Sequence, residues 1–186
     1  HSNLGTVLLE LGHAEESVVC FQKALELKSQ LPTALSNLLL GRLYLANTDI
    51  SENVTLARQI NSQLPPADRY SHRAPNIADR NRRLNIGFVS SDLRRHAVSS
   101  FLENVWAELK SEHIDIFAYS TSRTEDDVSE RLKKKVTAWR NIAGLPIAHK
   151  ARRISEDKID ILVDLGGHTA QNNLDVFALK PAPIQV

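Results

Sequence analysis

Cysteine and methionine are the scarcest residues of this 186-residue sequence, which has one cysteine, Cys20, and no methionine. A single cysteine excludes an intrachain disulfide and any multi-thiolate metal site that this chain could build alone. Long apolar runs are also missing, and none approaches the roughly 20 residues that span a bilayer. No charged stretch followed by an apolar one opens the sequence, as a secretory signal would. We therefore expect a cytoplasmic protein that does not partner with a membrane.

An excess of charge of one sign is absent as well. The 23 Lys and Arg residues oppose 22 Asp and Glu residues, which leaves a net charge of +1. This balance argues against a nucleic-acid partner held by bulk charge. The sequence has no glycine-rich dinucleotide fingerprint, no P-loop, no His-Glu-x-x-His and no Cys-x-x-Cys. It therefore predicts neither a cofactor nor a metal site.

The two ends of the sequence predict a piece of a longer protein. His1 lies inside an expected helix, and residues 184–186 form an apolar ending directly after a proline-containing loop. Together with the missing methionine, these features lead us to expect that both ends are cuts.

Residues 1–62 combine helical periodicity with an internal repeat. The triplet Ser-Asn-Leu at residues 2–4 returns at residues 36–38, an offset of 34 residues that is the tetratricopeptide period. The second unit is degenerate, with Leu39 where Gly5 stood and Arg42 where Leu8 stood. A plain antiparallel helical pair with an accidental match is the alternative. The pattern predicts helices over residues 1–11, 14–28, 32–46 and about 51–62.

Residues 63–84 are predicted to be a basic linker between two domains. Pro65 and Pro66 stop the preceding helix. One interpretation is a solvated connector, and the other is a basic rim over an anionic substrate such as a nucleotide diphosphate. The basic residues of this stretch are Arg69, His72, Arg73, Arg80, Arg82 and Arg83.

From Leu84 the hydrophobic pattern changes to that of a second domain, residues 85–186. Short apolar runs at 86–89, 114–119 and 159–165 predict strands, and there is room for one more around residues 139–142. Helices are expected over residues 124–136 and 147–156. A further helix is expected between the first two strands, with one face formed by Phe101, Val105, Trp106 and Leu109. This alternation predicts a parallel α/β sheet.

Two histidines follow predicted strands, at the ends where parallel sheets bind ligands. His96 lies just before a helix whose expected capping box is Ser100 with Glu103. The positive end of the helix dipole disfavours an imidazolium, so a neutral His96 could accept a proton near pH 7. His168 follows Gly166 and Gly167, which let the backbone turn sharply. We predict that the two histidines face one crevice; alternatively each is an ordinary surface residue beside an ordinary turn.

Three stretches carry a family resemblance: LNIGFVSSDLRRH at residues 84–96, IDILVDLGGHT at 159–169 and FALKPAPIQV at 177–186. Preceded by helical repeats, they resemble the O-linked N-acetylglucosamine transferase family, glycosyltransferase family 41, in its bacterial form related to SPINDLY. The resemblance implies an α plus α/β fold: tetratricopeptide repeats followed by the first part of a parallel Rossmann-like lobe of a two-lobed GT-B enzyme. It also implies inverting transfer of a sugar from a nucleotide donor, UDP-N-acetylglucosamine, to Ser or Thr hydroxyls of proteins.

The resemblance assigns roles to particular residues. It implies that His96 is the catalytic histidine and that Asp92 and residues 167–169, Gly167, His168 and Thr169, contact substrate. Animal members carry Tyr at the position of His168. The second lobe, which supplies most donor contacts in the family, has no match here, so the donor-binding residues are unknown and this chain is expected to be inactive alone.

The repeats would present acceptor proteins or peptides along a concave groove. Asn3 and Asn37 are candidate peptide-binding residues, since their amides can bond an extended backbone; the alternative is that they contact only water. Two other functions are left open by the sequence. One is O-fucosyl transfer of the SPINDLY type, and the other is a non-enzymatic repeat scaffold with a relic catalytic lobe. The oligomeric state is not predicted.

Overall fold

The computed structural model describes residues 1–64, 70–72, 82–109 and 112–186. The chain divides into two compact units, His1–Pro66 and Ala67–Val186, which are described separately. Most of the predicted basic linker, including Arg69, Arg73 and Arg80, lies outside the described residues. No helix in the described parts of the chain is long and apolar enough to cross a membrane.

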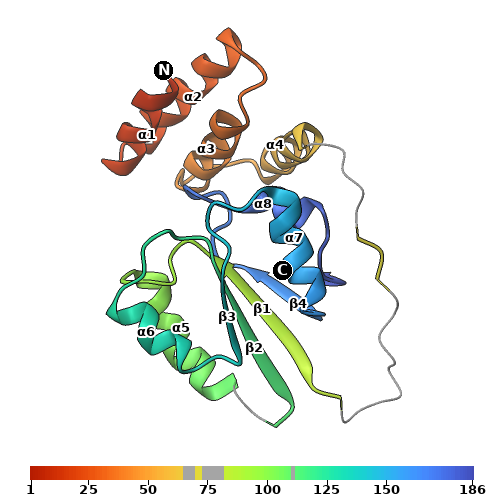
Figure 1. Ribbon diagram of the computed structural model, residues 1–186. Coiled ribbons are helices and arrows are strands. Elements are labelled where there is room, and N and C mark those ends of the chain that lie inside the picture. The colour runs from red at the N-terminus through yellow and green to blue at the C-terminus, as the bar shows by residue number, and fades with distance from the viewer. Residues whose placement is uncertain (65–69, 73–81, 110–111) are drawn as a thin grey trace. The chain divides into compact units, whose positions relative to one another are not determined.

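The first unit is helical, as the periodicity predicts, and residues 1–64 contain no strand. Its helices are α1 (Ser2–Glu10), α2 (Ala14–Leu27), α3 (Pro32–Leu43) and α4 (Ile50–Gln63), and each packs on the next (Figure 1). Gly12 ends α1 with φ at 84°, a conformation that suits glycine. The amide of His13 then donates back to the Leu8 carbonyl over 2.9 Å.

Helix α3 ends at Leu43, three residues before the predicted end. The Thr48 hydroxyl explains the early end, because it donates to the carbonyls of Arg42 over 2.7 Å and Leu45 over 3.1 Å. These side-chain bonds satisfy carbonyls that a longer helix would have bonded through its backbone.

A close contact between Gly5 and Phe21 fixes the packing of α1 on α2. Phe21 is fully buried, and Gly5 is the buried residue of α1. A Cβ atom on Gly5 would lie 2.7 Å from Cε1 of the Phe21 ring. The ring therefore occupies the space that a side chain at position 5 would need, so the two helices approach more closely than larger residues allow.

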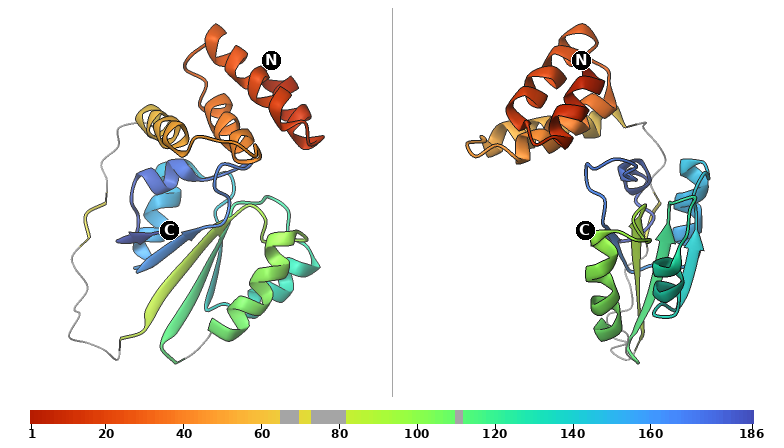
Figure 2. Two further views of the ribbon diagram at one scale, coloured as in Figure 1. Left: turned by 180° about the vertical axis from the view of Figure 1, so that it is seen from behind. Right: turned by 90° about the vertical axis from the view of Figure 1, so that its left-hand side faces the viewer.

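The second unit is a five-stranded, all-parallel sheet, which confirms the predicted α/β alternation. Its strand order is β3-β2-β1-β4-β5. Helices α5 and α6 lie together on one side of the strands, and α7 and α8 lie on the other (Figures 1 and 2). The strands are β1 (Leu84–Ser90), β2 (Ile114–Ser120), β3 (Ala138–Asn141), β4 (Ile161–Asp164) and β5 (Ile184–Gln185). The helices are α5 (Ala97–Leu109), α6 (Asp127–Lys133), α7 (Ile147–Glu156) and α8 (Leu174–Ala178).

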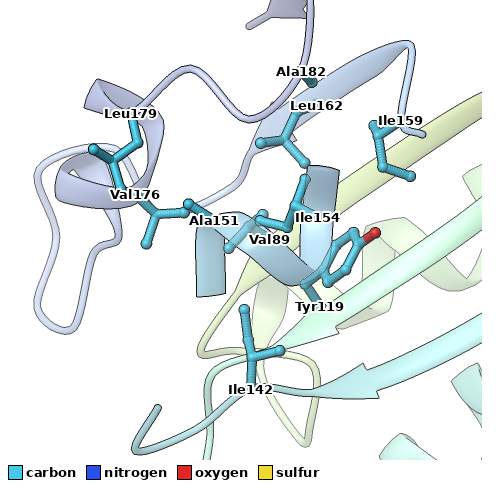
Figure 3. Close-up of a cluster of buried hydrophobic side chains, with 10 residues drawn as sticks. All are labelled: Val89, Tyr119, Ile142, Ala151, Ile154, Ile159, Leu162, Val176, Leu179 and Ala182. Atoms are coloured by element: carbon cyan, nitrogen blue, oxygen red, sulfur yellow. The ribbon is translucent and has the colours of Figure 1, made fainter. Parts of the chain in front are cut away.

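Each face of the sheet has its own apolar core, because neighbouring residues of a strand point to opposite faces. Phe88 packs against α5, with its ring 5.4 Å from the Trp106 ring. Val89 belongs to the other core, with residues of α7 and α8 (Figure 3). Both faces of β1 are thus covered, which explains its continuous apolar run.

The predicted buried face of α5 is partly wrong. Phe101 and Val105 are 75% and 45% exposed, whereas Leu102 and Trp106 are buried against the sheet. The helix begins at Ala97, and the stripe that faces the sheet runs through residues 102, 106 and 109 at spacings of four and three. Phe101 and Val105 each stand one residue before this stripe and are therefore rotated away from it by about 100°.

The short strand β5 is not among the predicted strands. It is recognisable only by its backbone bonds to β4, which include Val186 N to Leu162 O over 3.0 Å. A two-residue strand after Pro183 carries no periodicity of its own.

Replacing Gly5 with alanine should destabilise the helical unit by about 1–3 kcal/mol, since the added methyl group must displace a buried ring. This cost outweighs the gain of up to ~1 kcal/mol in helix propensity. Hydrogen exchange of peptides from α1 and α2, measured along a urea series, reports the change for this unit alone.

Gly41→Ala is the matched control, because its Cβ atom would lie 3.3 Å from the nearest atoms, on Ser17 and Val18. The smaller overlap should cost less than the one at Gly5. Equal stability of Gly5→Ala and the parent chain would refute the packing argument.

Candidate active site

The loops that follow β1 and β4 leave the sheet side by side. The two strands are parallel neighbours, with Val89 beside Asp164, and the amide of Leu165 donates to the Val89 carbonyl over 3.1 Å. The chain winds from β1 through β2 to β3 and then returns to place β4 on the other side of β1. This reversal is the switch point at which open parallel sheets bind ligands. The segments with His96 and His168 both leave the sheet there, while their facing one crevice stays a prediction.

The loop after β1 is tied to its own helix. The Ser90 hydroxyl accepts the Asp92 amide over 2.9 Å, which forms a tight turn at the strand end. The buried Ser99 hydroxyl of α5 donates to the Asp92 carbonyl over 2.6 Å. These bonds fix the backbone of Asp92, so its carboxylate has a defined position near the following helix.

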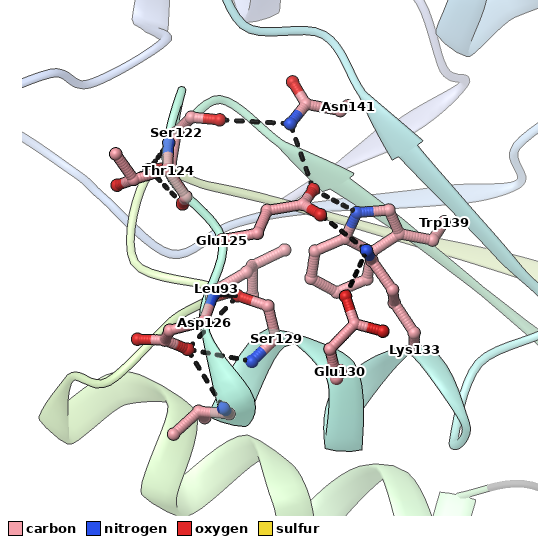
Figure 4. A network of polar contacts seen from close by, with 11 residues as sticks. Leu93, Ser122, Thr124, Glu125, Asp126, Ser129, Glu130, Lys133, Trp139 and Asn141 are labelled. Atoms are coloured by element: carbon pink, nitrogen blue, oxygen red, sulfur yellow. Dashed lines mark hydrogen bonds and ion pairs between the residues drawn. The ribbon is translucent and has the colours of Figure 1, made fainter.

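A second set of bonds ties the same loop to α6, far away in sequence. Ser129 donates its hydroxyl hydrogen to the Leu93 carbonyl over 2.7 Å (Figure 4). The Asp126 carboxylate accepts the Arg95 amide over 2.7 Å. Asp126 also caps α6 by accepting the amides of Val128 and Ser129. The pKa of the Asp126 carboxyl lies below its ordinary value, first because of the Arg95 amide bond. The start of α6 thus holds the residue directly before His96.

A polar cluster holds the Asp126 segment in turn. The Glu125 carboxylate accepts from the Trp139 indole and from the Asn141 amide, each over 3.0 Å (Figure 4). Lys133 pairs with Glu125, and its ammonium lies 5.6 Å from the centre of the Trp139 ring. The cluster anchors residues 122–126 to the carboxyl end of β3.

His96 caps helix α5 with its own side chain. Its ring atom Nδ1 accepts the Val98 amide over 3.3 Å and lies 3.9 Å from the Asp92 carboxylate. In this arrangement a neutral ring carries its proton on Nε2. The side chain is 44% exposed, so it can reach a substrate.

The predicted capping box is therefore wrong. Ser100 lies inside the first turn, where its amide donates to the His96 carbonyl over 3.3 Å. Glu103 instead accepts two hydrogen bonds from Arg131 of α6. The helix begins four residues earlier than the box requires because the histidine itself supplies the capping acceptor.

The loop after β4 is shaped by Asp164. Its carboxylate accepts the amides of Gly166 over 3.1 Å and Gly167 over 2.7 Å. Gly167 has φ at 53°, which glycine adopts without strain. Thr169 closes the turn, since its hydroxyl donates to the Gly166 carbonyl over 2.6 Å. The two glycines thus serve a turn that presents His168.

His168 is half-buried in this loop. Burial lowers the pKa of its imidazole below 6.5, and the nearby Asp164 carboxylate acts in the opposite direction. The ring is therefore neutral at pH 7 and can accept or donate a hydrogen bond.

Asn173 is a structural anchor that the sequence patterns do not reveal. Its side chain is 3% exposed, and its amide donates to the Thr121 hydroxyl over 3.3 Å and the Gln171 carbonyl over 3.2 Å. Its carbonyl oxygen accepts from the Lys150 ammonium over 2.9 Å. Asn173 thereby joins the end of the His168 loop to the loop after β2 and to α7. The partners outside its own loop lie 23 and 52 residues away, so no local spacing could have indicated this role.

Other predicted residues lie away from this edge. Arg82 pairs with Asp160 and Arg83 with Asp115, both at the amino ends of the strands. These two arginines therefore do not form a rim at the carboxyl edge. In the helical unit, the Asn37 amide donates to Thr6 over 3.3 Å, and Asn3 is exposed. Their role in peptide binding stays a prediction.

The described residues contain no group of three or more His, Cys, Asp or Glu side chains that could hold a metal ion. The arrangement at the carboxyl edge offers two imidazoles, the Asp92 carboxylate and backbone groups. This set can position a hydroxyl group and move a proton.

Comparisons with known proteins place these residues in context. A family model described as glycosyl transferase family 41 matches residues 59–186. A probable UDP-N-acetylglucosamine–peptide N-acetylglucosaminyltransferase SPINDLY of Oryza sativa subsp. japonica is 42% identical over 116 residues, 60% of this chain and 12% of its own length. A UDP-N-acetylglucosamine–peptide N-acetylglucosaminyltransferase of Caenorhabditis elegans is 30% identical over 122 residues, 64% of this chain and 10% of its own length.

A solved structure resembles the whole chain. A mutant of the Thermobaculum terrenum O-GlcNAc transferase superposes with a TM-score of 0.89 and 34% sequence identity. The match covers 100% of this chain and 36% of that one. The chain thus spans about a third of the solved relative and about an eighth of the rice protein.

Replacing Asp126 with alanine should loosen the loop before His96. The amides of Arg95, Val128 and Ser129 lose their acceptor, so their hydrogen exchange should accelerate by about tenfold or more. Because the carboxyl pKa is lowered, the parent chain should show the same loosening only when the pH falls through that lowered value. NMR-detected exchange measures each amide.

Asp127→Ala is the control for Asp126→Ala. It removes the ion pair with the Arg95 guanidinium but leaves the Asp126 carboxylate, which accepts the three amides, in place. Exchange as fast in Asp127→Ala as in Asp126→Ala would contradict the assigned role of Asp126.

An NMR titration should give His168 a midpoint below 6.5, because burial disfavours the charged ring. Asp164→Asn should lower the midpoint further, since it removes the charge that favours imidazolium. His168→Gln identifies the signal among the seven histidines. A midpoint that rises in Asp164→Asn would reverse the assigned sign.

Proposed function

The chain belongs to glycosyl transferase family 41, and from this premise we propose that it forms part of a protein O-N-acetylglucosaminyltransferase. The reaction moves N-acetylglucosamine from UDP-N-acetylglucosamine to a Ser or Thr hydroxyl with inversion. The activities for which the rice and nematode relatives are named support this donor and a peptide acceptor. The observation that carries the proposal is that the loops with His96 and His168 leave adjacent strands at the switch point.

The two units take different parts in this proposal. The parallel sheet corresponds to part of the first Rossmann-like lobe of a two-lobed GT-B enzyme. The four helices correspond to two tetratricopeptide repeats, since successive helices pack on each other and the triplet at residues 2–4 recurs after 34 residues. The repeats would bind acceptor proteins, with Asn3 and Asn37 toward the peptide backbone. A cytoplasmic location stays a prediction.

The catalytic step requires an acceptor oxygen in line with the anomeric carbon and a route for its proton. We assign to His96 the role of general base, which accepts the proton of the acceptor hydroxyl. In the capping arrangement its Nδ1 is occupied by the Val98 amide, so Nε2 bears the hydrogen. A small rotation would let Nδ1–H donate to Asp92, whose carboxylate lies 3.9 Å away. That tautomer exposes the Nε2 lone pair to the acceptor hydroxyl.

Asp92 would then act as a positioning residue for the histidine. Its backbone is already held by Ser90 and Ser99, so the carboxylate offers a fixed partner. When Nε2 takes the hydroxyl proton, the carboxylate stabilises the imidazolium that forms. His168 and the Gly167–Thr169 backbone would contact the sugar or the acceptor from the neighbouring loop. The mechanism needs no metal ion, and the donor-binding residues are not assigned on this chain.

The activity can be tested in a chimera, because the Thermobaculum terrenum enzyme matches every residue of this chain. Its matching segment is replaced by residues 1–186, and transfer from UDP-N-acetylglucosamine to a Ser- or Thr-containing peptide is measured. We expect transfer by the chimera and none by the 186-residue chain alone. His96→Ala should lower kcat by about 10²–10⁴-fold with little change in the donor KM, since it removes the general base.

Two variants sharpen this test. Asp92→Asn should lower kcat by a smaller factor than His96→Ala does, because the base stays in place but loses its partner. His113→Ala, at the amino edge of the sheet, should leave kcat unchanged. If His96→Ala keeps kcat but abolishes donor binding, His96 is a donor ligand and not the base. Transfer from a GDP-fucose donor in place of the UDP donor would favour the fucosyl alternative.

A further inference from the structure

Arg94, in the loop after β1, is a partly buried cation whose side chain lacks a partner. Within the described parts of the chain, its guanidinium forms no ion pair and donates no hydrogen bond. The Nε atom is enclosed by protein, so its N–H finds neither an acceptor nor water. A buried donor without an acceptor is unfavourable and rare in folded proteins. The carboxyl edge of the sheet therefore holds a positive charge that no described carboxylate pairs with.

Charged groups beside Arg94 in the sequence have other partners. Arg95 pairs with Asp127 of α6 over 2.8 Å. Asp92, two residues before Arg94, has its carboxylate 3.9 Å from the His96 ring instead. Charge-assisted hydrogen bonds are among the strongest polar contacts in proteins. The loop thus uses its other charges internally and leaves one guanidinium for a ligand.

The backbone of Arg94 is held on both sides. Before it, the Leu93 carbonyl accepts the Ser129 hydroxyl over 2.7 Å. After it, the Arg95 amide donates to the Asp126 carboxylate over 2.7 Å. The side chain of Arg94 therefore starts from a fixed point of the loop. A cation on a fixed backbone loses less conformational entropy on binding than one on a loop that must first become ordered.

Arg94 is also close to the proposed general base. Two residues of backbone span at most about 7 Å, which limits the separation of the Cα atoms of Arg94 and His96. An extended peptide advances about 3.3 Å per residue. When the acceptor hydroxyl lies at His96, acceptor residues one or two positions away are thus at a distance similar to that of Arg94.

The geometry of inversion favours an anion of the acceptor over the diphosphate of the donor. In an in-line displacement, the attacking oxygen and the leaving group lie on opposite sides of the anomeric carbon. A base that takes the proton of the attacking hydroxyl therefore lies on the acceptor side. A cation in the same fixed loop, two residues before the base, belongs to that side as well.

We propose that Arg94 is a specificity-determining residue that binds a carboxylate of the acceptor protein, supplied by an Asp or Glu within two positions of the glycosylated Ser or Thr. This proposal rests on the proposed function, which provides the acceptor and the base. One carboxylate can accept two parallel hydrogen bonds from one guanidinium, so it would supply the oxygens that Arg94 lacks. The Nε–H group would join this pair after a small movement of the side chain.

The test uses the chimera described above and peptides that differ only near the acceptor Ser. Each peptide carries one Glu at one of the two positions on either side of this Ser, and its matched partner carries Gln there. Transfer gives kcat/KM, and fluorescence anisotropy with UDP present gives the peptide Kd. At one or more positions, we expect Glu to be preferred over Gln by about tenfold in both quantities.

Two substitutions of Arg94 should change this preference in different ways. Arg94→Gln should reduce it to about twofold or less and leave the donor KM and transfer to the Gln peptides as in the parent. Arg94→Glu should invert it, so that Lys at the same peptide position is favoured over Glu. A gain for the Lys peptide cannot come from misfolding. Exchange of the Arg95 amide at the parent rate shows that the loop is intact.

Arg123→Gln is the matched control, because it removes an equal charge from an exposed residue in the loop after β2, at the same edge. The Arg123 guanidinium lies over the loop after β3, with Nη2 3.8 Å from the position of a Cβ atom on Gly144. Strand β3 is on the side of β2 away from β1. The Glu preference should therefore survive in Arg123→Gln.

Four results would overturn the proposal. The first is a parent chimera that treats Glu and Gln peptides alike, and the second is a preference that survives in Arg94→Gln. The third is an equal loss in Arg123→Gln, since a general field would then explain the preference. The fourth is a donor KM that rises in Arg94→Gln as much as the peptide preference falls, which would assign Arg94 to the diphosphate. A chimera that transfers to no peptide would contradict the proposed function instead, and the anisotropy measurements would still decide the role of Arg94.

Discussion

The pairing of β1 with a strand on each side is the constraint on which the α/β unit depends. Its residues pair with β2 along its whole length and with β4 from Ile86 to Val89. Gly87 makes this possible, because a Cβ atom there would lie 2.9 Å from Leu162 and 3.0 Å from Tyr119. These two side chains close over β1 from the neighbouring strands. Because β1 and β4 are parallel neighbours, the loops that follow them leave the sheet at the same edge. The segments with His96 and His168 therefore begin at one edge.

How much of this arrangement the sequence predicts depends on how far apart in the sequence the interacting residues lie. Hydrophobic periodicity predicts the helices of the first unit, the four longer strands and α7, because the pattern of each element lies within its own residues. It fails for β5, whose two residues are defined by bonds to β4, and for the face of α5, where Phe101 is as apolar as the buried Leu102. A pattern cannot tell two adjacent apolar residues apart until a partner surface is present.

The candidate site divides in the same way. The turns built by Ser90 and Asp164 are local, with donors two or three residues away, and the Ser-Ser-Asp and Asp-Leu-Gly-Gly stretches indicate them. Asp126 holds the loop after β1 from 31 residues away, and Asn173 ties the end of the loop after β4 to Thr121, 52 residues away. Neither interaction leaves a mark in the local sequence. For His96 the sequence predicts one feature and misses another. It predicts that the residue lies just before a helix, but not that its own side chain caps that helix. The residues that fix the geometry of a site are thus harder to predict than those that would perform its chemistry.

The charges at the two edges of the sheet bear on which part of a substrate the site suits. At the amino edge, Arg82 and Arg83 are held by aspartates. At the carboxyl edge, Arg95 pairs with Asp127 and Lys150 bonds Asn173, so these cations already serve the loops. Asp92 and Asp164 lie beside the two histidines, and carboxylates repel phosphate. Imidazoles, a carboxylate and turn backbone suit an uncharged hydroxyl or sugar better than a diphosphate. Under the proposed function, we place the acceptor side of the transfer, where a proton must be moved, at this edge. The charge of a leaving nucleotide would then call for cations or helix ends beyond this set.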